Sequence, residues 1–145
     1  WEAVGAAVEL EILSLPELQQ VIKDRDYEAL LFGEVLGFDP DPFSFWHSSQ
    51  KRDPGLNLAL YDNKDADKLL EEARQTLDRS ARVSKYDDFQ KLVAKDIPAI
   101  FLYSPAYLYG LPGKIKGADI RAIPLPSDRF GEINRWYIET ERVRR

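Results

Sequence analysis

Cysteine and methionine are both missing from this chain of 145 residues. The absence of cysteine excludes disulfides, thiol catalysis and thiolate metal sites together. The absence of methionine means that Trp1 cannot be a translation start, so we expect a processed product or an excised part of a longer protein. Long apolar runs are missing too, because none approaches the roughly 18 residues that a spanning helix needs. The first residues also show no signal-peptide pattern.

Positive charge is scarce and dispersed in this chain. The net charge is −5 at pH 7, and basic residues are mixed with acids except at Arg142, Arg144 and Arg145. No basic face is available to neutralise phosphates, which argues against a nucleic-acid partner. The composition of 44% hydrophobic and 31% charged residues is typical of a globular protein with a packed core. We expect a single domain over residues 1–145.

The amino-terminal part of the chain alternates between strand and helix signals. Val8, Leu10 and Ile12 alternate with glutamates, which indicates a strand with one buried face. Ser14 and Glu17 have the spacing of a capping box and open an apolar stripe at helical intervals. A continuous apolar run over residues 29–32 indicates a second, buried strand. This order predicts a right-handed βαβ unit at the start of an α/β fold, with a mixed sheet flanked by helices.

Two helices and two more strands are predicted farther along the chain. Asn63 or Asp65 can cap a helix, whose apolar stripe is Ala66, Leu69, Leu70, Ala73 and Leu77. A second helix ends before Pro98, and its apolar face is Val83, Tyr86, Phe89 and Val93. Residues 99–103 and 106–109 indicate strands. The tail over residues 133–138 carries Trp136 and Tyr137, and we expect it to dock on the body of the protein.

The segment GFDPDPFSFWHSSQ, residues 37–50, is too aromatic for an ordinary solvent-exposed loop. It follows the predicted strand that ends at Phe32, and ligands of open α/β sheets lie outside the carboxyl ends of the strands. Aromatic side chains supply large contact areas, and Glu34, Asp39 and Asp41 could orient a cationic or hydrogen-bonding group. The loop either recognises a ligand or caps the edge of the sheet, and its composition leaves both interpretations open.

His47 is the only histidine of the chain. A metal site would require further ligands, and no second histidine, cysteine or dense carboxylate group accompanies it. Ser48 or Ser104 could act as a nucleophile, but the sequence has no Gly-x-Ser-x-Gly elbow to expose one. We therefore expect no metal, no cofactor and no catalysis.

A set of short motifs occurs in order along the whole chain. They are DYEALLFG (26–33), DPDP (39–42), NLALYDN (57–63), DKLLEEAR (67–74), Arg82, Tyr86, PAIFLY (98–103) and the pair Trp136 and Tyr137. Each motif alone is weak, but the ordered set resembles the carboxyl-terminal part of family 5 extracellular solute-binding proteins. These are the peptide, oligopeptide and nickel receptors of ABC importers.

The resemblance implies a fold and a function. The chain would be most of one lobe of a periplasmic-binding-protein type II-like fold, with the amino-terminal lobe outside it. Two such lobes close on a solute by a hinge motion and deliver it to the membrane permease without chemistry. An oligopeptide is the favoured solute, although nickel and sugar binders share the scaffold. The location would be extracytoplasmic, in the periplasm or at the cell surface through a lipid anchor on the absent amino terminus.

The resemblance also implies that residues 33–50 form part of the wall of the binding cleft. Leu36 stands where peptide-binding relatives carry an aspartate that pairs with the α-ammonium group of the peptide, and Glu34 is the nearest carboxylate. Contacts to ligand or to the missing lobe are assigned to Phe45, Trp46 and His47, while Asn57 and Tyr61 position the following segment. Such a half-site should bind weakly or not at all by itself. Its exposed inter-lobe face favours self-association.

Two other classes of function stay open on the sequence. One is a hydrolase that uses His47, which a loss of turnover in a His47→Ala variant would indicate. The other is a small interaction domain whose aromatic loop binds a partner protein, which a short stand-alone reading frame would indicate.

Overall fold

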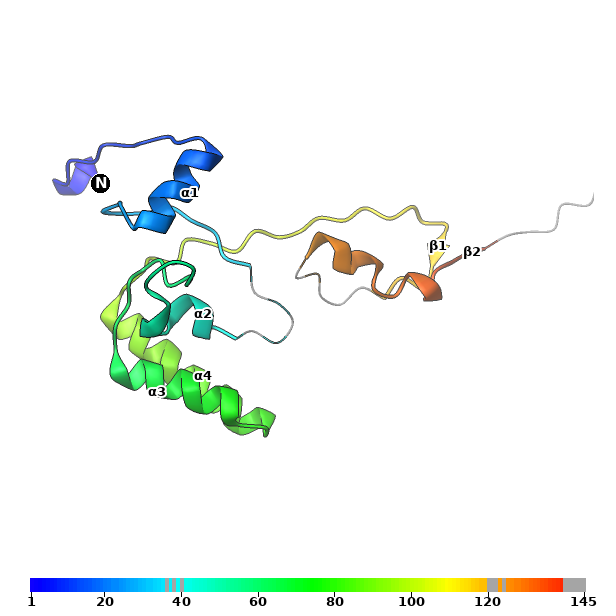
Figure 1. Ribbon diagram of the computed structural model, residues 1–145. Helices are drawn as coiled ribbons and strands as arrows, with labels where there is room; N and C mark the ends of the chain where they lie inside the picture. The colour runs from blue at the N-terminus through cyan, green and yellow to red at the C-terminus, as the bar shows by residue number, and fades with distance from the viewer. Residues whose placement is uncertain (36, 38, 40, 120–122, 124, 140–145) are drawn as a thin grey trace, which may run out of the picture. The chain divides into compact units, whose positions relative to one another are not determined.

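The chain forms two compact units (Figure 1). The computed structural model describes residues 1–35, 37, 39, 41–119, 123 and 125–139. The first unit contains Trp1–Phe32 and Pro42–Ala99, and the second contains Gly33–Asp41 and Ile100–Arg145. Each unit has its own internal packing, and the single domain expected from chain length stays a prediction.

The first unit begins with two helices that differ in length. η1 (Glu2–Val4) is one short 3-10 turn, and α1 (Leu15–Asp24) is a regular α-helix. The predicted capping box is present, because the Ser14 N–H donates to the Glu17 carboxylate at 2.9 Å. α1 ends at Asp24, and the C-cap residue Arg25 has a φ of 58°, which takes the backbone out of the helical region. A local sequence signal therefore defines the amino-terminal end of α1.

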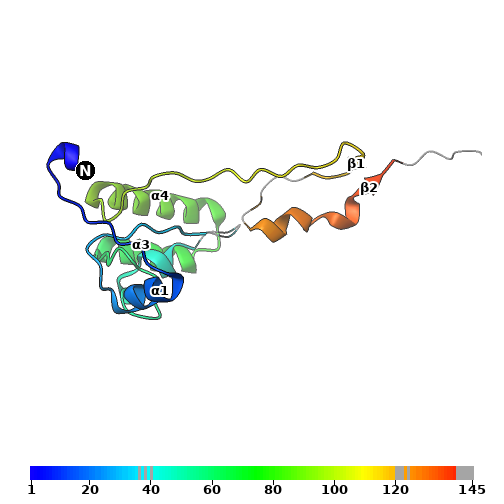
Figure 2. The ribbon, with the colours of Figure 1, turned by 90° about the horizontal axis from the view of Figure 1, so that it is seen from above.

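An antiparallel helical hairpin dominates the first unit, as two views show (Figures 1 and 2). α3 (Lys64–Gln75) is capped by Asn63, whose side-chain oxygen accepts from the Asp65 and Ala66 N–H groups. α4 (Arg79–Asp96) is capped by Asp78, which accepts from the Ala81 N–H at 2.8 Å. Both predicted helices are confirmed. No helix in the described ranges is long and apolar enough to cross a membrane.

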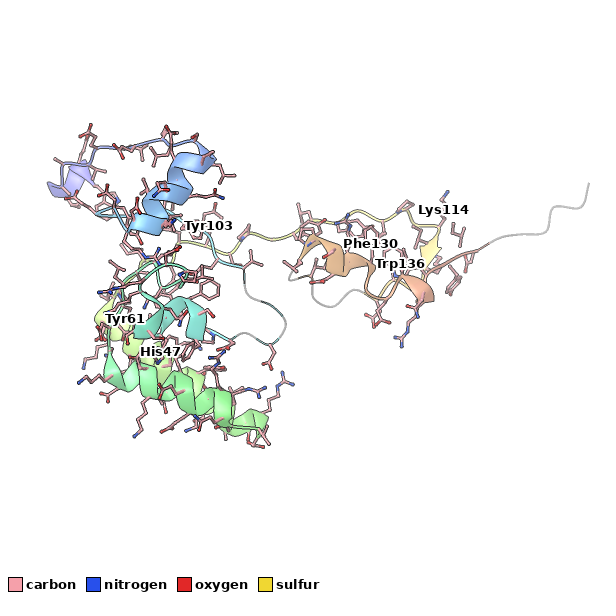
Figure 3. The ribbon with its side chains drawn as sticks, viewed as in Figure 1. His47, Tyr61, Tyr103, Lys114, Phe130 and Trp136 are labelled. Atoms are coloured by element: carbon pink, nitrogen blue, oxygen red, sulfur yellow. The ribbon has the colours of Figure 1, made fainter. Side chains whose placement is uncertain are left out.

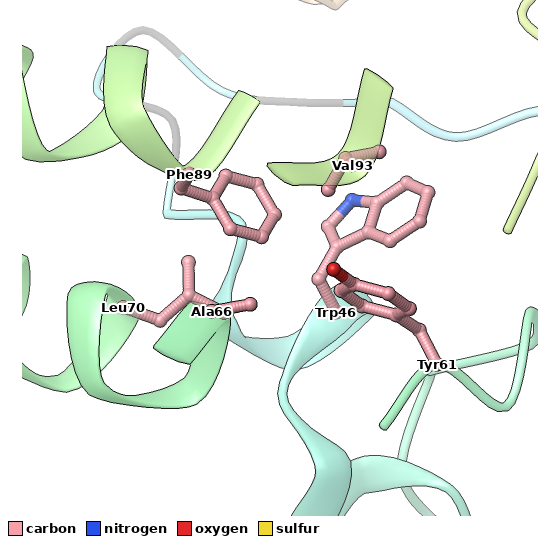
Figure 4. Packing of buried hydrophobic residues seen from close by; sticks show 6 residues of the cluster. All are labelled: Trp46, Tyr61, Ala66, Leu70, Phe89 and Val93. Carbon is pink, nitrogen blue, oxygen red and sulfur yellow. The ribbon is translucent and has the colours of Figure 1, made fainter. Parts of the chain in front are cut away.

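The hairpin packs on α2 (Phe43–Trp46), which is followed by the 3-10 turn η2 (Ser48–Gln50). Trp46 makes edge-to-face contacts with Tyr61 and Phe89, each with ring centroids 6.3 Å apart. Such pairs stabilise a core beyond the area they bury. The core cluster shown in Figure 4 is Trp46, Tyr61, Ala66, Leu70, Phe89 and Val93.

Two residues of the predicted helix faces lie outside this core. Leu77 is 96% exposed, because α3 ends at Gln75 and Thr76 has an extended backbone that breaks the helical register. Val83 is also exposed, although Phe89 and Val93 on the same helix are buried. The prediction that these two side chains join the core is wrong.

The second unit is built around a short antiparallel pair of strands. β1 (Ile115–Lys116) pairs with β2 (Tyr137–Ile138), with Ile115 opposite Ile138. Gly117 follows β1 with a φ of 76°, and a Cβ there would lie 2.3 Å from the Arg135 carbonyl oxygen, so only glycine fits. Two 3-10 helices, η3 (Pro126–Phe130) and η4 (Ile133–Arg135), lead into β2.

Aromatic residues hold the tail of the chain within the second unit. The ring centroids of Phe130 and Trp136 are 6.2 Å apart, and the two side chains lie together in Figure 3. The Arg129 guanidinium lies 4.4 Å from the centroid of the Phe130 ring, within cation–π range. The segment that carries Trp136 thus has its packing partners inside the second unit.

The predicted βαβ start and mixed sheet are not formed within the described residues. Residues 8–12, 27–32, 99–103 and 106–109 are in neither a helix nor a strand, and the sheet is the single antiparallel pair of β1 and β2. The predicted βαβ unit is therefore not seen in the described part of this chain. Periodicity identifies a segment suited to a strand, but a strand also needs a hydrogen-bonding neighbour, and these runs have none among the described residues.

Candidate functional site

Asn57 organises the candidate site in the first unit. Its side chain is fully buried, and its amide nitrogen lies 2.9 Å from the Tyr61 carbonyl oxygen, 3.1 Å from that of His47 and 3.2 Å from that of Trp46. Its side-chain oxygen accepts from the Tyr61 N–H at 3.0 Å. One side chain therefore ties the end of α2 to the segment that enters α3.

His47 lies directly beside this node and is itself 8% exposed. Its Nδ1 accepts from the Ser49 N–H at 3.1 Å, so the proton of the neutral ring resides on Nε2. Nε2 in turn lies 3.3 Å from Glu71 Oε1 and 3.9 Å from Asp67 Oδ1 on α3. His47 thus joins the loop to α3 through Nε2, while Nδ1 bonds within the loop.

Stacking adds a second restraint on the imidazole ring. Phe43 and His47 stack with ring centroids 4.1 Å apart and planes inclined by 20°. The Arg74 guanidinium lies 4.2 Å from the centroid of the Phe43 ring, a cation–π contact. His47, Phe43 and Arg74 therefore form a chain of ring and cation contacts that reaches from the loop to α3.

Asp67 holds the turn that follows His47. Its two carboxylate oxygens accept from the Ser48 N–H at 2.8 Å and the Ser48 hydroxyl at 2.6 Å. A charge-assisted pair of this kind is stronger than a neutral hydrogen bond. Ser48, the first residue of η2, is thus hydrogen-bonded to α3 through Asp67.

Arg25 and Tyr27 tie α1 to the same loop. The Arg25 guanidinium donates to the Lys51 carbonyl at 3.0 Å and to the Gly55 carbonyl at 2.6 Å. The Tyr27 hydroxyl donates to the Leu58 carbonyl at 2.7 Å. Residues 51–58 are therefore held by side chains from a distant part of the sequence.

Tyr61 extends the network to the end of α4. Its hydroxyl donates to Asp96 Oδ2 at 2.7 Å, and the Asn63 amide donates to the same oxygen at 2.7 Å. These two hydrogen bonds hold the pKa of the Asp96 carboxyl below its ordinary value. Burial, followed by the bond to the anionic Asp96, raises the pKa of the Tyr61 hydroxyl. The native state therefore favours a neutral phenol beside a carboxylate.

The depressed pKa of Asp96 predicts a stability change at low pH. Its contribution is fully present above the pKa of the unfolded chain, about 3.9, and is lost as the pH falls through the lower pKa of the folded state. We expect thermal stability to fall between about pH 5 and pH 2 less steeply in Asp96→Asn than in the parent. Melting temperatures across this range, with the exposed Asp87→Asn on the same helix as a control, test this. Equal slopes in all three proteins would contradict it.

The structure separates the predicted site residues into two groups. Trp46, His47, Asn57 and Tyr61 are buried together in the first unit, where Figure 3 labels His47 and Tyr61, and Phe45 is half-buried against the core. Glu34 is exposed and belongs to the second unit, and Leu36 lies outside the described residues. Their contact with a ligand stays a prediction.

Several residues that shape this site are not evident from sequence reasoning. Asp67, Glu71 and Arg74 all face the loop from α3, and Arg25 reaches it from the end of α1. The spacing of i, i+4 and i+7 places the three α3 residues on one helix face, which was the available signal. Across the described ranges, no group of three potential metal ligands is found.

Three known proteins are similar to this chain in sequence. No family model matches it. It is 28% identical over 137 residues to the oligopeptide-binding protein AppA of Bacillus subtilis (strain 168), which covers 93% of this chain and 24% of AppA. It is 29% identical over 117 residues to the probable D,D-dipeptide-binding periplasmic protein DdpA of Escherichia coli (strain K12), covering 79% of this chain and 22% of DdpA. The nickel-binding protein NikA of Staphylococcus aureus (strain NCTC 8325 / PS 47) is 25% identical over 118 residues, 79% of this chain and 24% of NikA.

A solved structure agrees with these relatives. The oligopeptide-binding protein AppA from Bacillus subtilis, in complex with a nonapeptide, matches with a TM-score of 0.68 and 27% identity, over 94% of this chain and 27% of that chain. The resemblance to family 5 solute-binding proteins is confirmed, and so is the fold class of a helix-rich α/β part of a larger protein. The chain spans about a quarter of the length of the relatives it matches.

Proposed function

We propose that this chain is part of the solute-binding component of an ABC importer. In this role it captures a solute between two lobes and delivers it to the membrane permease, without chemistry and outside the cytoplasm. The observation that carries the proposal is the similarity to AppA, which extends over more than nine-tenths of the chain in both sequence and structure. The relatives compared are all named as binding proteins.

The favoured solute is an oligopeptide. AppA is named as an oligopeptide-binding protein, and its matched structure holds a nonapeptide. A peptide can be held mainly through its backbone, with permissive pockets for its side chains, so the site needs few charged groups. Glu34 is an exposed carboxylate that could receive a cationic group of the peptide, whereas Leu36 offers none.

The loop residues divide into two proposed roles. Asn57, Trp46 and Tyr61 position the cleft wall from within the core, because their side chains are buried and their polar groups already have partners. The proposed contacts to solute or to the second lobe are the half-buried Phe45 and His47, although the His47 side chain is as buried as that of Trp46. A rigid support of this kind lowers the entropy that a binding loop loses when it binds.

The hydrolase alternative depends on His47 and is less well supported by its surroundings. The Ser49 hydroxyl lies 2.8 Å from His47 Nδ1, and Glu71 lies beside Nε2. However, the Nδ1 lone pair already accepts the Ser49 backbone N–H, so it is occupied at the point where a general base must take a proton. We therefore propose binding without catalysis.

A thermal-shift experiment tests the proposed solute. The full reading frame that encodes this chain is screened against mixed oligopeptides, nickel and oligosaccharides, since a ligand of the folded state raises the melting temperature. At a concentration about 100 times the dissociation constant, a peptide should add about 2.7 kcal/mol to stability. This is a shift of several degrees.

The chain of 145 residues alone is the matched control, because a half-site should give no shift with the same peptides. A response to nickel or oligosaccharides with none to peptides would replace the proposed solute. No response to any of the three would count against the binding role.

A further inference from the structure

Two apolar runs in the first unit lie outside every helix and strand. Residues 8–12 connect η1 with α1, and residues 28–32 follow α1 (Figure 1). Neither run shares a backbone hydrogen bond with another described residue. Backbone polar groups in folded proteins are nearly always paired with protein or with water. Both runs therefore present a row of N–H and C=O groups to their surroundings.

The side chains of the first run are arranged as in a strand with one covered face. Val8, Leu10 and Ile12 are 54%, 79% and 88% exposed, and they alternate with Glu9 and Glu11. This alternation places the apolar groups on one side and the carboxylates on the other. An apolar row beside unpaired backbone groups is the kind of edge to which another strand adds.

The second run begins with Glu28 and is then apolar without alternation over residues 29–32. Leu31 is 81% exposed and Phe32 is 53% exposed, and both side chains stand at the end of the run. Continuous apolar residues are typical of strands that are covered on both faces. A solvent-exposed connection would instead be rich in glycine, proline and small polar residues, which this run is not.

Two buried donors in the second unit also lack an acceptor among the described residues. Arg129 Nε and Trp136 Nε1 are buried atoms with no acceptor in the described part of the chain. Buried donors of this kind nearly always have a partner in complete structures. Their acceptors therefore lie outside the described residues.

The length of the relatives identifies what supplies these neighbours. The match to the AppA structure covers 94% of this chain but only 27% of the AppA chain. We infer that residues 8–12 and 28–32 are sheet strands whose hydrogen-bonding neighbours lie in the remaining three quarters of the solute-binding polypeptide. The identity of this partner depends on the proposed function, whereas the pairing does not depend on which solute binds.

Hydrogen exchange monitored by mass spectrometry tests the inference on the full reading frame, with no solute added. Amides of residues 8–12 and 28–32 should exchange at least about 100-fold more slowly than in an unstructured peptide. Exchange at the unstructured rate in both runs, with α3 and α4 protected, would overturn the inference. Because no solute is present, a failure to bind peptide leaves the result unaffected.

Matched variants identify the face and the partner. Leu10→Glu should accelerate exchange in residues 8–12 by about 10-fold or more, whereas Glu11→Gln on the opposite face should change it little. Equal effects of the two substitutions would refute a one-sided strand. Protection that appears only at concentrations where the protein dimerises would mean that a second copy supplies the neighbour, and the proposed partner would be wrong. If Leu10→Glu fails to fold, the exchange pattern of the unsubstituted protein still decides.

Discussion

Asn57→Ala should lower the free energy of unfolding by about 3 kcal/mol, because buried backbone groups lose the partner that the side chain supplies. The Tyr61 N–H and C=O both bond to Asn57, and the amide also reaches the carbonyls of Trp46 and His47. An unpaired buried polar group costs about 1–3 kcal/mol, and alanine leaves at least two of them. Urea unfolding followed by far-UV circular dichroism measures the change.

Asn134→Ala is the matched control for this substitution. Asn134 lies in η4, is exposed and loses the same atoms on substitution, so its effect should stay within about 0.5 kcal/mol. At a pH where its carboxyl is protonated, Asn57→Asp retains an acceptor for the Tyr61 N–H and has one O–H donor in place of the two N–H donors of the amide, so it should fall between the parent and Asn57→Ala. A loss of less than about 1 kcal/mol in Asn57→Ala would show that water replaces the amide and that Asn57 is not the node of the loop.

Leu70→Ala should cost about 2–5 kcal/mol, the range seen when a large aliphatic side chain is removed from a core. Leu70 is fully buried between α3 and α4 and belongs to the cluster around Trp46 and Phe89. The cost combines the lost burial of the methyl groups with the cavity that remains. The same urea titration measures it.

Leu77→Ala removes the same atoms from a position only two residues beyond α3. Leu77 is 96% exposed, so its substitution should change stability by less than about 0.5 kcal/mol. The contrast between the two leucines tests the packing directly, because the sequence pattern places both on one helix face. Similar losses at the two positions would mean that Leu77 is covered in the folded protein.

These two predictions bear on how the loop could serve a binding site. Trp46 and Tyr61 belong to the core cluster, and Asn57 is fully buried. Substitutions at these three positions should therefore change binding by loosening the loop rather than by removing a contact with the solute. Binding and catalytic loops are often carried by a rigid scaffold in this way. Loss of binding should therefore accompany loss of stability at Asn57.

The helices were predictable because their signals are local. Ser14 and Glu17 form the capping box that their spacing indicates, and Asn63 caps α3 with its own side chain. The apolar stripe of α3 correctly predicts that Ala66, Leu70 and Ala73 are buried. A cap and a helical stripe involve residues three or four apart, so neighbouring sequence is enough to specify them.

The strands were not predictable in the same way, because a strand requires a neighbour. The alternation at Val8, Leu10 and Ile12 predicts a strand, but no described residue pairs with this segment, and the three side chains are exposed. The contacts of the candidate site were hidden for a related reason. Arg25 and the Lys51 carbonyl are 26 residues apart, and Tyr61 and Asp96 are 35 apart, so no local pattern links them.

By itself, the sequence determined α1, α3 and α4, the caps at Ser14 and Asn63, and the ordered set of motifs that carries the resemblance. Each of these depends on residue types at short or characteristic spacings. Tertiary structure alone decided that Asn57, Trp46 and Tyr61 are buried, that His47 joins the loop to α3, and that Leu77 is exposed. The physical reason is that burial and hydrogen bonding of a side chain depend on which distant segment packs against it. That segment is selected by the whole fold and not by the neighbouring sequence.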